Sequence, residues 1–232
     1  MIDIHSHILY GVDDGAKTVD ESLAMIKACF NHGINILFLT PHVAPKRGYM
    51  NTDSFIPRFN ELKKLVKKEG ISIKLLLGAE IDYSNQLEAY LKPEFSMNQS
   101  GVYMVDFGIS SVPLDEIIYE LSVKKIPIIL AHPERYFYSN FELLKKVKEV
   151  GGMFQVSAAN LLKGSPKKVN KLAKKLLKED MIDFIGSDAH HSSNNLEAME
   201  LAYRYVVKKK GKQVANDLFY ENAKRVLMID DA

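Results

Sequence analysis

Short apolar runs alternate along the whole chain with longer segments of helical periodicity, and this alternation constrains the fold more than any other feature. The runs cover residues 2–5, 35–40, 73–80, 102–107, 126–131, 153–157 and 182–186. They are apolar throughout rather than at every second residue, which indicates strands that are buried on both faces and paired in parallel. Repeated strand–helix units of this α/β class build either an open doubly wound sheet or a closed barrel.

The segments between the strands carry helix signals. Helices are predicted over about residues 18–33, 53–69, 114–124, 140–150, 166–179 and 195–210, with a short one at 221–226. The first begins with the capping-box pattern of Thr18 and Glu21 and ends at Gly33. No linker or low-complexity tract divides the sequence, so residues 1–232 are predicted to form a single domain.

Composition excludes several classes of protein. The 232 residues are 47% hydrophobic and 26% charged, as in ordinary soluble globular proteins. The net charge of +2 is too small to indicate a nucleic-acid partner, and the lysine runs are interpreted as solvated helix faces. Cys29 is the only cysteine, which fits a reducing compartment. With neither a signal-peptide pattern nor a long apolar run, we expect a cytoplasmic protein without membrane insertion.

Histidines and carboxylates are concentrated where the predicted strands end. Six of the seven histidines have such positions: His5, His7, His42, His132, His190 and His191. Acidic residues follow the same pattern: Asp13, Asp14, Glu80, Asp106 and Asp188. Each alone would be an ordinary loop residue or helix cap. In a parallel barrel, however, the carboxyl ends of all strands open onto one face, so we expect these side chains to converge. His32 lies in the last turn of the first helix and is interpreted as structural.

Two short motifs indicate that this cluster binds metal. His5-Ser6-His7 places two imidazoles on the same side of an extended strand, and Asp188-Ala189-His190 does the same with an acid and an imidazole. Nitrogen and oxygen ligands without a thiolate favour Mn, Fe or Zn over a structural cysteine site. About nine ligands are too many for one ion of four to six ligands, so two or three divalent ions sharing Glu80 are expected.

The motifs resemble those of the polymerase-and-histidinol-phosphatase (PHP) superfamily. They are His5-x-His7, Asp13-Asp14-Gly15, Thr40-Pro41-His42, Gly78-Ala79-Glu80, Ala131-His132-Pro133-Glu134-Arg135-Tyr136 and Ser187-Asp188-Ala189-His190. Within the superfamily, the first eight residues and the segment 132–136 look like the bacterial tyrosine-protein phosphatases of capsular and exopolysaccharide operons. The resemblance covers nearly the whole chain. It implies a distorted (β/α)7 TIM-like barrel, the PHP fold, with a trinuclear metal site for which manganese is the first choice.

The resemblance also implies how the ligands are divided. The first ion would take His5, His7, Glu80 and Asp188, the second Glu80, Asp106 and His132, and the third Asp14, His42 and His190. Position 106 is usually Glu in the family and is the shorter Asp here. A second arginine, usual shortly after the Asp-x-His motif, is missing from residues 191–195. Lys46 or Arg47 would then supply a second contact to phosphate.

The activity implied is hydrolysis of phosphotyrosine. A hydroxide bridging two ions would attack phosphorus in line with the leaving oxygen, because metal coordination lowers the pKa of water to about 7. Arg135, just after His132, is expected to bind the phosphate through its forked N–H groups. Tyrosinate, with a pKa near 10, needs less acid assistance on leaving than an alkoxide does. The loop residues Tyr49, Tyr136 and Tyr138 are candidates for stacking on the substrate ring.

By the same resemblance, the protein substrate would be the tyrosine-rich tail of a polysaccharide-assembly tyrosine kinase at the inner face of the membrane. The phosphatase would thereby regulate capsular or exopolysaccharide biosynthesis.

Other functions stay open on sequence grounds. A small-molecule phosphatase acting on histidinol phosphate, or on a sugar or nucleotide phosphate, would use the same fold and metals. A metal-dependent deacylase of the amidohydrolase type also begins with His-x-His, but usually in a larger barrel. A metal-storage or scaffold protein would not need Arg135. A cysteine-based phosphatase is excluded, because it needs an arginine six positions after the nucleophile, and the residue at that distance from Cys29 is Asn35.

Overall fold

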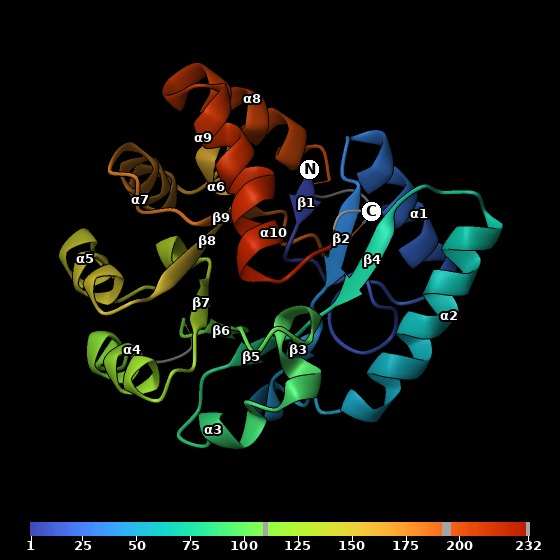
Figure 1. Ribbon diagram of the computed structural model, residues 1–232, viewed down its shortest axis with the longest axis horizontal. Helices are drawn as coiled ribbons and strands as arrows, with labels where there is room; N and C mark the ends of the chain where they lie inside the picture. The colour runs from blue at the N-terminus through green and yellow to red at the C-terminus, as the bar shows by residue number, and fades with distance from the viewer. Residues whose placement is uncertain (109–110, 192–195, 231–232) are drawn as a thin grey trace.

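A closed, all-parallel barrel forms the centre of the computed structural model, which describes residues 1–108, 111–191 and 196–230 (Figure 1). Its strands are β1 (Ile2–Asp3), β2 (Ile36–Leu39), β3 (His42–Val43), β4 (Lys74–Leu77), β5 (Glu80–Asp82), β6 (Tyr103–Asp106), β7 (Ile128–Ala131), β8 (Met153–Ser157) and β9 (Phe184–Gly186). They form two ladders, β1-β2-β4 and β3-β5-β6-β7-β8-β9. A parallel bridge between Ser6 and Ala189 closes the circle. The prediction of a barrel is confirmed, and the open sheet is excluded.

Nine strand segments stand where seven strands were predicted, because one predicted strand is divided and β3 lies beyond the predicted run 35–40. The run 73–80 was predicted as one strand, which is wrong: it splits into β4 and β5. Pro41 separates β2 from β3 in the same way, since a proline nitrogen cannot donate to the ladder. The chain resumes pairing beyond the break, where Glu80 N donates to Pro41 O over 3.1 Å. The break therefore sets where Glu80 stands.

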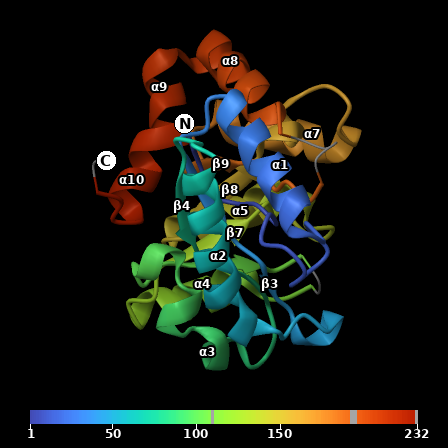
Figure 2. The ribbon, with the colours of Figure 1, turned by 90° about the vertical axis from the view of Figure 1, so that its right-hand side faces the viewer.

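Helices surround the barrel (Figures 1 and 2). The longer ones are α1 (Val19–Asn31), α2 (Phe55–Lys68), α4 (Leu114–Val123), α5 (Phe141–Glu149), α7 (Lys167–Lys178) and α8 (Ala198–Lys210). Shorter ones are α3 (Leu87–Tyr90), α6 (Ala158–Leu161), α9 (Lys212–Asn216) and α10 (Asn222–Val226). Each long helix matches a predicted one, although the predicted start of α8 at Asn195 lies outside the described residues. Helices as short as α3 and α6 leave no periodic signal in the sequence.

Two apolar cores explain why the strands are apolar on both faces. Alternate residues such as Leu37 and Leu39 pack outward against the helices, whereas Phe38 and Met104 fill the interior of the barrel. The interior core also contains Leu227 and Ile229, so the segment from α10 onward closes the amino-terminal end of the barrel. The other end of the barrel interior contains polar side chains.

This closure predicts a strong dependence of stability on Leu227, whose side chain is fully buried. Replacing it with alanine leaves a cavity at the bottom of the barrel and should cost about 2–5 kcal/mol of unfolding free energy. Met228 is 70% exposed, so Met228→Ala should change little. Denaturant unfolding of both variants in chelator tests this, and equal stabilities would contradict a closing role for this segment.

Candidate metal centre

The carboxyl ends of the strands bring all nine predicted ligand residues together. Their side chains form four overlapping groups in which the potential ligand atoms lie within 4.8 Å of one another. The groups are His7 with Asp14, His42 and His190; His5 with His7 and Glu80; His5 with His132 and Asp188; and Glu80 with Asp106 and His132. The last corresponds to the ligand division that the family resemblance implied. Two other groups differ from that division. His7 joins the group of Asp14, His42 and His190, and His132 joins the pair of His5 and Asp188.

His5 and His7 form the centre of the cluster. Their Nε2 atoms are 3.2 Å apart, and each lies 3.3–3.4 Å from Oε2 of Glu80 and 3.5 Å from Oδ1 of Asp188. Two ligand atoms bound about 2.1 Å from one ion at tetrahedral or octahedral angles stand about 3.0–3.4 Å apart. The spacing of these four side chains therefore suits a shared cation.

Both imidazoles are oriented by side chains that do not belong to the predicted ligand set. Nδ1 of His5 lies 2.9 Å from Oε1 of Gln155, and Nδ1 of His7 lies 2.9 Å from Oδ2 of Asp13. With the Nδ1 atoms donating to these oxygens, the lone pairs of both Nε2 atoms face the cluster. Asp13 also accepts the backbone N–H of His42 over 3.0 Å and that of Gly15 over 2.9 Å. Sequence reasoning missed Gln155; its signal was a polar residue inside a buried strand.

Glu80 joins the two sides of the cluster. Its Oε1 lies 2.9 Å from Nε2 of His132, and its Oε2 lies 3.0 Å from Nδ1 of His42. Asp106 follows on the neighbouring strand, where Oδ1 accepts the backbone N–H of Gly108 over 2.7 Å. A carboxylate with neighbours on both sides is suited to bridge two ions, as the sequence predicted for Glu80.

Two of the candidate ligands have left-handed backbone conformations. The backbone φ angle is 34° at His132 and 53° at Asp188, values that residues other than glycine rarely adopt. The barrel retains these conformations at the ends of β7 and β9, where they direct both side chains into the cluster. Such local strain is typical of functional sites.

Charge is concentrated in this buried space. Burial opposes ionisation of Glu80, but the histidines around it, His5 and His42 foremost, hold its pKa well below the ordinary value. Burial likewise opposes the charged form of His132, yet the charges of Asp106 and Glu80 raise its pKa to about 9. Ionised acids and protonated imidazoles thus share the site. Since metals bind only deprotonated imidazole, metal binding would release protons.

Several buried polar atoms in the cluster have no hydrogen-bond partner among the described residues. They are Asp14 Oδ1, His42 Nδ1, Glu80 Oε2, both carboxylate oxygens of Asp82 and His132 Nδ1. The contact of 3.0 Å between His42 Nδ1 and Glu80 Oε2 does not have hydrogen-bond geometry. Buried polar atoms without partners are costly unless a ligand satisfies them. The donor set is nitrogen and oxygen throughout, so the residues present fit divalent metal ions. Asp82, which sequence reasoning also missed, lies 3.8 Å from His42 Nδ1, and burial raises its pKa to about 6.

The predicted phosphate-binding arginines lie at the edge of the cluster. Arg135 pairs with Oδ2 of Asp188 and donates to Ser157 Oγ over 2.9 Å. Arg47 donates to Oδ2 of Asp14 over 2.8 Å, and its guanidinium lies 5.1 Å from the ring centre of Tyr49. Both guanidinium groups therefore carry their charge beside a candidate ligand, where an anion bound to the metals would meet them.

The remaining candidates are not all part of the site. Tyr49 stacks on His42 with ring centres 5.7 Å apart, whereas Tyr136 is only 2% exposed and packs in the core. Tyr138 donates its hydroxyl to Phe107 O over 2.9 Å. His32 pairs with Glu200 at the end of α1, away from the cluster, as predicted. Cys29 is fully buried in α1. The segment 191–195, where the family usually has a second arginine, lies outside the described residues except for His191.

Comparisons with known proteins place these features in a family. The family model described as capsular polysaccharide synthesis, CpsB/CapC, matches residues 1–228. The tyrosine-protein phosphatase CpsB of Streptococcus agalactiae is 29% identical over 240 residues, covering 98% of each chain. No helix among the described residues is long and apolar enough to cross a membrane.

Solved structures agree with the sequence match. A crystal structure from work on YwqE of Bacillus subtilis and CpsB of Streptococcus pneumoniae, called unique metal-dependent tyrosine phosphatases, superposes with a TM-score of 0.88. It shares 30% identity and covers 100% of this chain and 96% of its own. Histidinol phosphate phosphatase of Lactococcus lactis shares the fold with a TM-score of 0.56 and 14% identity, covering 90% and 93% of the two chains. The chain therefore belongs to the CpsB/CapC family of capsular polysaccharide synthesis proteins.

Proposed function

We propose that this protein is a metal-dependent protein-tyrosine phosphatase that hydrolyses phosphotyrosine in a protein substrate. The observation that carries the proposal is the convergence of nine nitrogen and oxygen ligand residues at one end of the barrel, with Arg135 beside them. The comparisons support it, because relatives that align with nearly the full length of the chain are named tyrosine-protein phosphatases.

We further propose that two or three divalent ions bind here, with manganese preferred to iron or zinc. The ligands would be His5, His7, Asp14, His42, Glu80, Asp106, His132, Asp188 and His190. Such ions would generate a nucleophile from water near neutral pH and would neutralise charge on the phosphoryl oxygens.

The side chains around the ligands have separate tasks in this proposal. Asp13 and Gln155 accept from Nδ1 of His7 and His5 and so aim the Nε2 atoms of both rings at the cluster. Arg135, with its side chain 36% exposed, would bind the non-bridging oxygens of the phosphate and stabilise the charge that develops on them. Arg47, held between Asp14 and Tyr49, would approach the phosphate from the opposite rim. The ring of Tyr49 is available beside His42 for an aromatic substrate.

Tyrosine phosphate is preferred to histidinol phosphate for two reasons. The likeness to the histidinol phosphatase is limited to the fold at 14% identity, whereas the likeness to the tyrosine phosphatases extends to 30% identity. In addition, tyrosinate, with a pKa near 10, leaves with less protonation than an alkoxide.

The physiological setting is proposed from the family. The substrate would be a tyrosine kinase of polysaccharide assembly, dephosphorylated in the cytoplasm, and residues 1–232 would act as one domain. Three observations support this setting: the family's description in capsular polysaccharide synthesis, the buried single cysteine, and the bridge that joins Ser6 near the start of the barrel to Ala189 near its end.

The substrate test compares kcat/KM of the manganese-loaded protein on a phosphotyrosyl peptide and on histidinol phosphate. We expect the peptide to be preferred by at least about tenfold, a difference of about 1.4 kcal/mol in transition-state binding, and chelation to abolish turnover. Preference for histidinol phosphate would move the function to small-molecule metabolism. Turnover that survives complete chelation would refute a metal-dependent reaction.

The ligand assignment predicts the effect of Glu80→Gln, which keeps the shape of the side chain and removes the charge shared by the ions. Metal affinity should fall by at least about tenfold, as measured by titration calorimetry and elemental analysis of the dialysed protein. Glu116→Gln, on the exposed face of α4, serves as the matched control and should bind metal normally. Unchanged metal content in Glu80→Gln would contradict a bridging role.

Arg135→Lys tests the proposed phosphate contact, because lysine retains the charge but loses the forked geometry. We expect kcat/KM on the phosphotyrosyl peptide to fall by about 10²-fold, with metal content preserved. Arg225→Lys, on an exposed position of α10, should leave the kinetics unchanged. If Arg135→Lys instead loses metal while the turnover per bound ion stays constant, Arg135 supports Asp188 rather than the substrate.

A further inference from the structure

The barrel wall has a gap beside β4, on the half of the molecule away from the metal centre. β4 pairs with β2 on one side. The strand expected on its other side, β6, pairs instead with β5, which follows β4 after an interruption of the strand. Within the part of the chain that the structure describes, no strand therefore covers the outer edge of β4. The turn Met97–Gln99 packs at one end of the gap, where Met97 touches Gly78.

The backbone of β4 is left with unpaired groups at this edge. Lys74 N donates to Asn35 O over 2.8 Å, and Gly78 N donates to Leu39 O over 3.0 Å. The N–H groups at these even-numbered positions therefore point toward β2. Because the N–H groups of successive residues in a strand point in opposite directions, those of Leu75 and Leu77 face the gap. Among the described residues, neither has a hydrogen-bond partner across it.

Side-chain exposure shows the same opening. Phe38 and Met104, on the inner face of the neighbouring strands, are fully buried, as expected in a closed barrel. Leu76, which packs in the same inner core, is only partly buried, and so is Leu77 on the outer face. The barrel is therefore closed at its carboxyl-terminal end, whereas its wall is partly exposed to solvent along β4.

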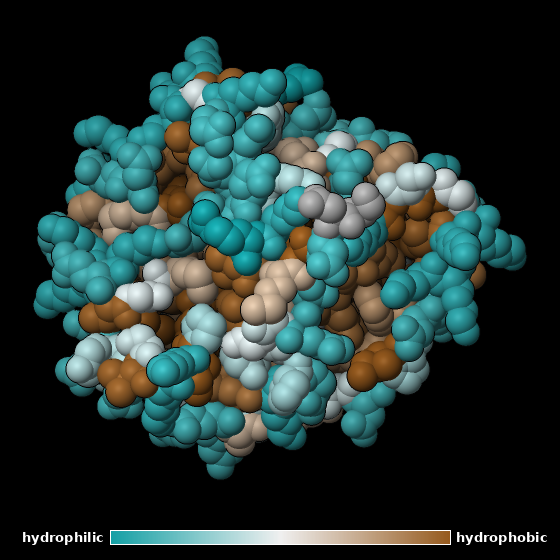
Figure 3. All heavy atoms as spheres, in the orientation of Figure 1, coloured by the Kyte–Doolittle hydropathy of each residue, from teal (hydrophilic) through white to brown (hydrophobic). Residues whose placement is uncertain are grey.

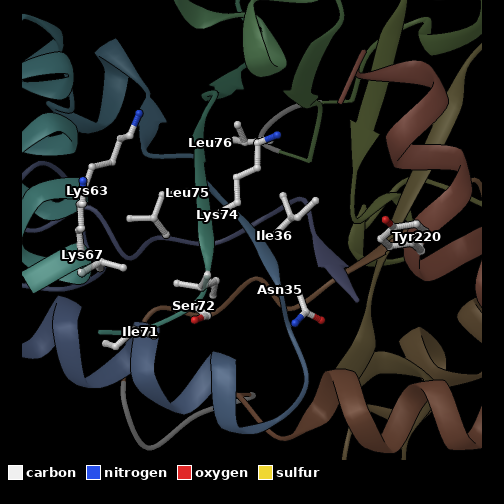
Figure 4. Close-up of a pocket in the computed structure, with 12 residues that line it drawn as sticks. Asn35, Ile36, Lys63, Lys67, Ile71, Ser72, Lys74, Leu75, Leu76 and Tyr220 are labelled. Atoms are coloured by element: carbon white, nitrogen blue, oxygen red, sulfur yellow. The ribbon is translucent and has the colours of Figure 1, made fainter. Parts of the chain in front are cut away.

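A cavity of about 870 Å³ surrounds this edge (Figure 4). Leu75 points toward α2, while Leu76 and Ile36 lie on the side of Tyr220 (Figure 4). The lining thus combines residues of the outer core with residues of the barrel interior, so the cavity touches both faces of β4. In the space-filling view, apolar surface extends over the region of β4 and α2 and is bordered by hydrophilic side chains (Figure 3).

The charge of this groove has one sign. Lys63 and Lys67, one turn apart on the exposed face of α2, and Lys74 of β4 line it, and no acidic residue does among the described lining residues. The ammonium group of Lys74 reaches the backbone carbonyl of Asp230 over 3.3 Å. Lys63 and Lys67, which the sequence pattern indicated as part of a solvated helix face, therefore border an apolar groove with a free strand edge.

We propose that this groove binds an extended, acidic segment of a partner protein, which adds to β4 as a further strand. The free backbone groups of Leu75 and Leu77 would pair with the segment, its apolar side chains would enter the cavity, and its carboxylates would meet the lysines. A second copy of this chain is a poor occupant, because two such edges would bring lysines against lysines. A nucleic acid has no backbone pattern that complements a strand edge.

Lysines beside a free strand can also serve only to prevent aggregation, and experiment separates the two roles. The probe is a short, end-blocked peptide of alternating glutamate and valine, labelled for fluorescence anisotropy and titrated with the full chain. We expect saturable binding that weakens with added salt, and no binding of the lysine–valine counterpart. Absence of binding by the glutamate–valine peptide overturns the proposal.

Two comparisons define the mode of binding. Lys63→Glu combined with Lys67→Glu should weaken binding at least about tenfold, whereas Lys167→Glu with Lys171→Glu, at the same spacing on exposed positions of α7, should not. Thermal melting establishes that both double variants fold. A peptide N-methylated at alternate residues keeps its charge but cannot pair along one edge, so it should bind the wild-type protein at least about tenfold more weakly. Equal binding of the methylated peptide, or equal weakening by both double variants, overturns strand addition in favour of general attraction to anions.

Discussion

One buried carboxylate, that of Glu80, makes contact with four imidazoles, and the rest of the architecture is arranged around this contact. Its two oxygens lie within about 3.4 Å of ring nitrogens from four histidines that come from three different strand ends: His5, His7, His42 and His132. Bringing these groups out of water is costly unless each finds an opposite charge or a metal. A closed barrel is a solution, because it gathers the carboxyl ends of distant strands onto one face and holds them rigidly.

The interior of the barrel is divided along its axis in consequence. Its amino-terminal half is an apolar core closed by Leu227 and Ile229, and its carboxyl-terminal half contains the charged cluster. The chain break at Pro41 lies close to the boundary between these halves. Beyond it, β5 pairs with β3 on one side and with β6 on the other, and Glu80 of β5 reaches the cluster, whereas β4 pairs with β2 alone among the described strands. The metal centre therefore lies where the sheet is paired on both sides of this strand, and the free edge lies where it is paired on one side.

Residues outside the ligand set determine what the cluster can do. Asp13 and Gln155 fix the tautomers of two histidines, and left-handed backbone at His132 and Asp188 aims two further ligands inward. Arg135 is tied to Asp188, so a phosphate contact there would be coupled to the ligand itself. The proposed docking groove lies on the other half of the barrel, beside β4, so a partner held there would leave the catalytic mouth free.

The sequence by itself determined the type and order of the elements and the chemical nature of the site. Alternating apolar runs and helical periods are local signals, and the histidines and acids at strand ends needed only the rule that parallel strands finish on one face. The long helices and the convergence of all nine ligand residues followed from these signals. Only the tertiary structure decided which atoms meet: Gln155 and Asp82 at the cluster, Arg135 on Asp188, the closure by the last segment and the free edge of β4. These features depend on distances between segments far apart in the chain and on where the pairing of each strand begins and ends, and no local pattern of residues encodes them.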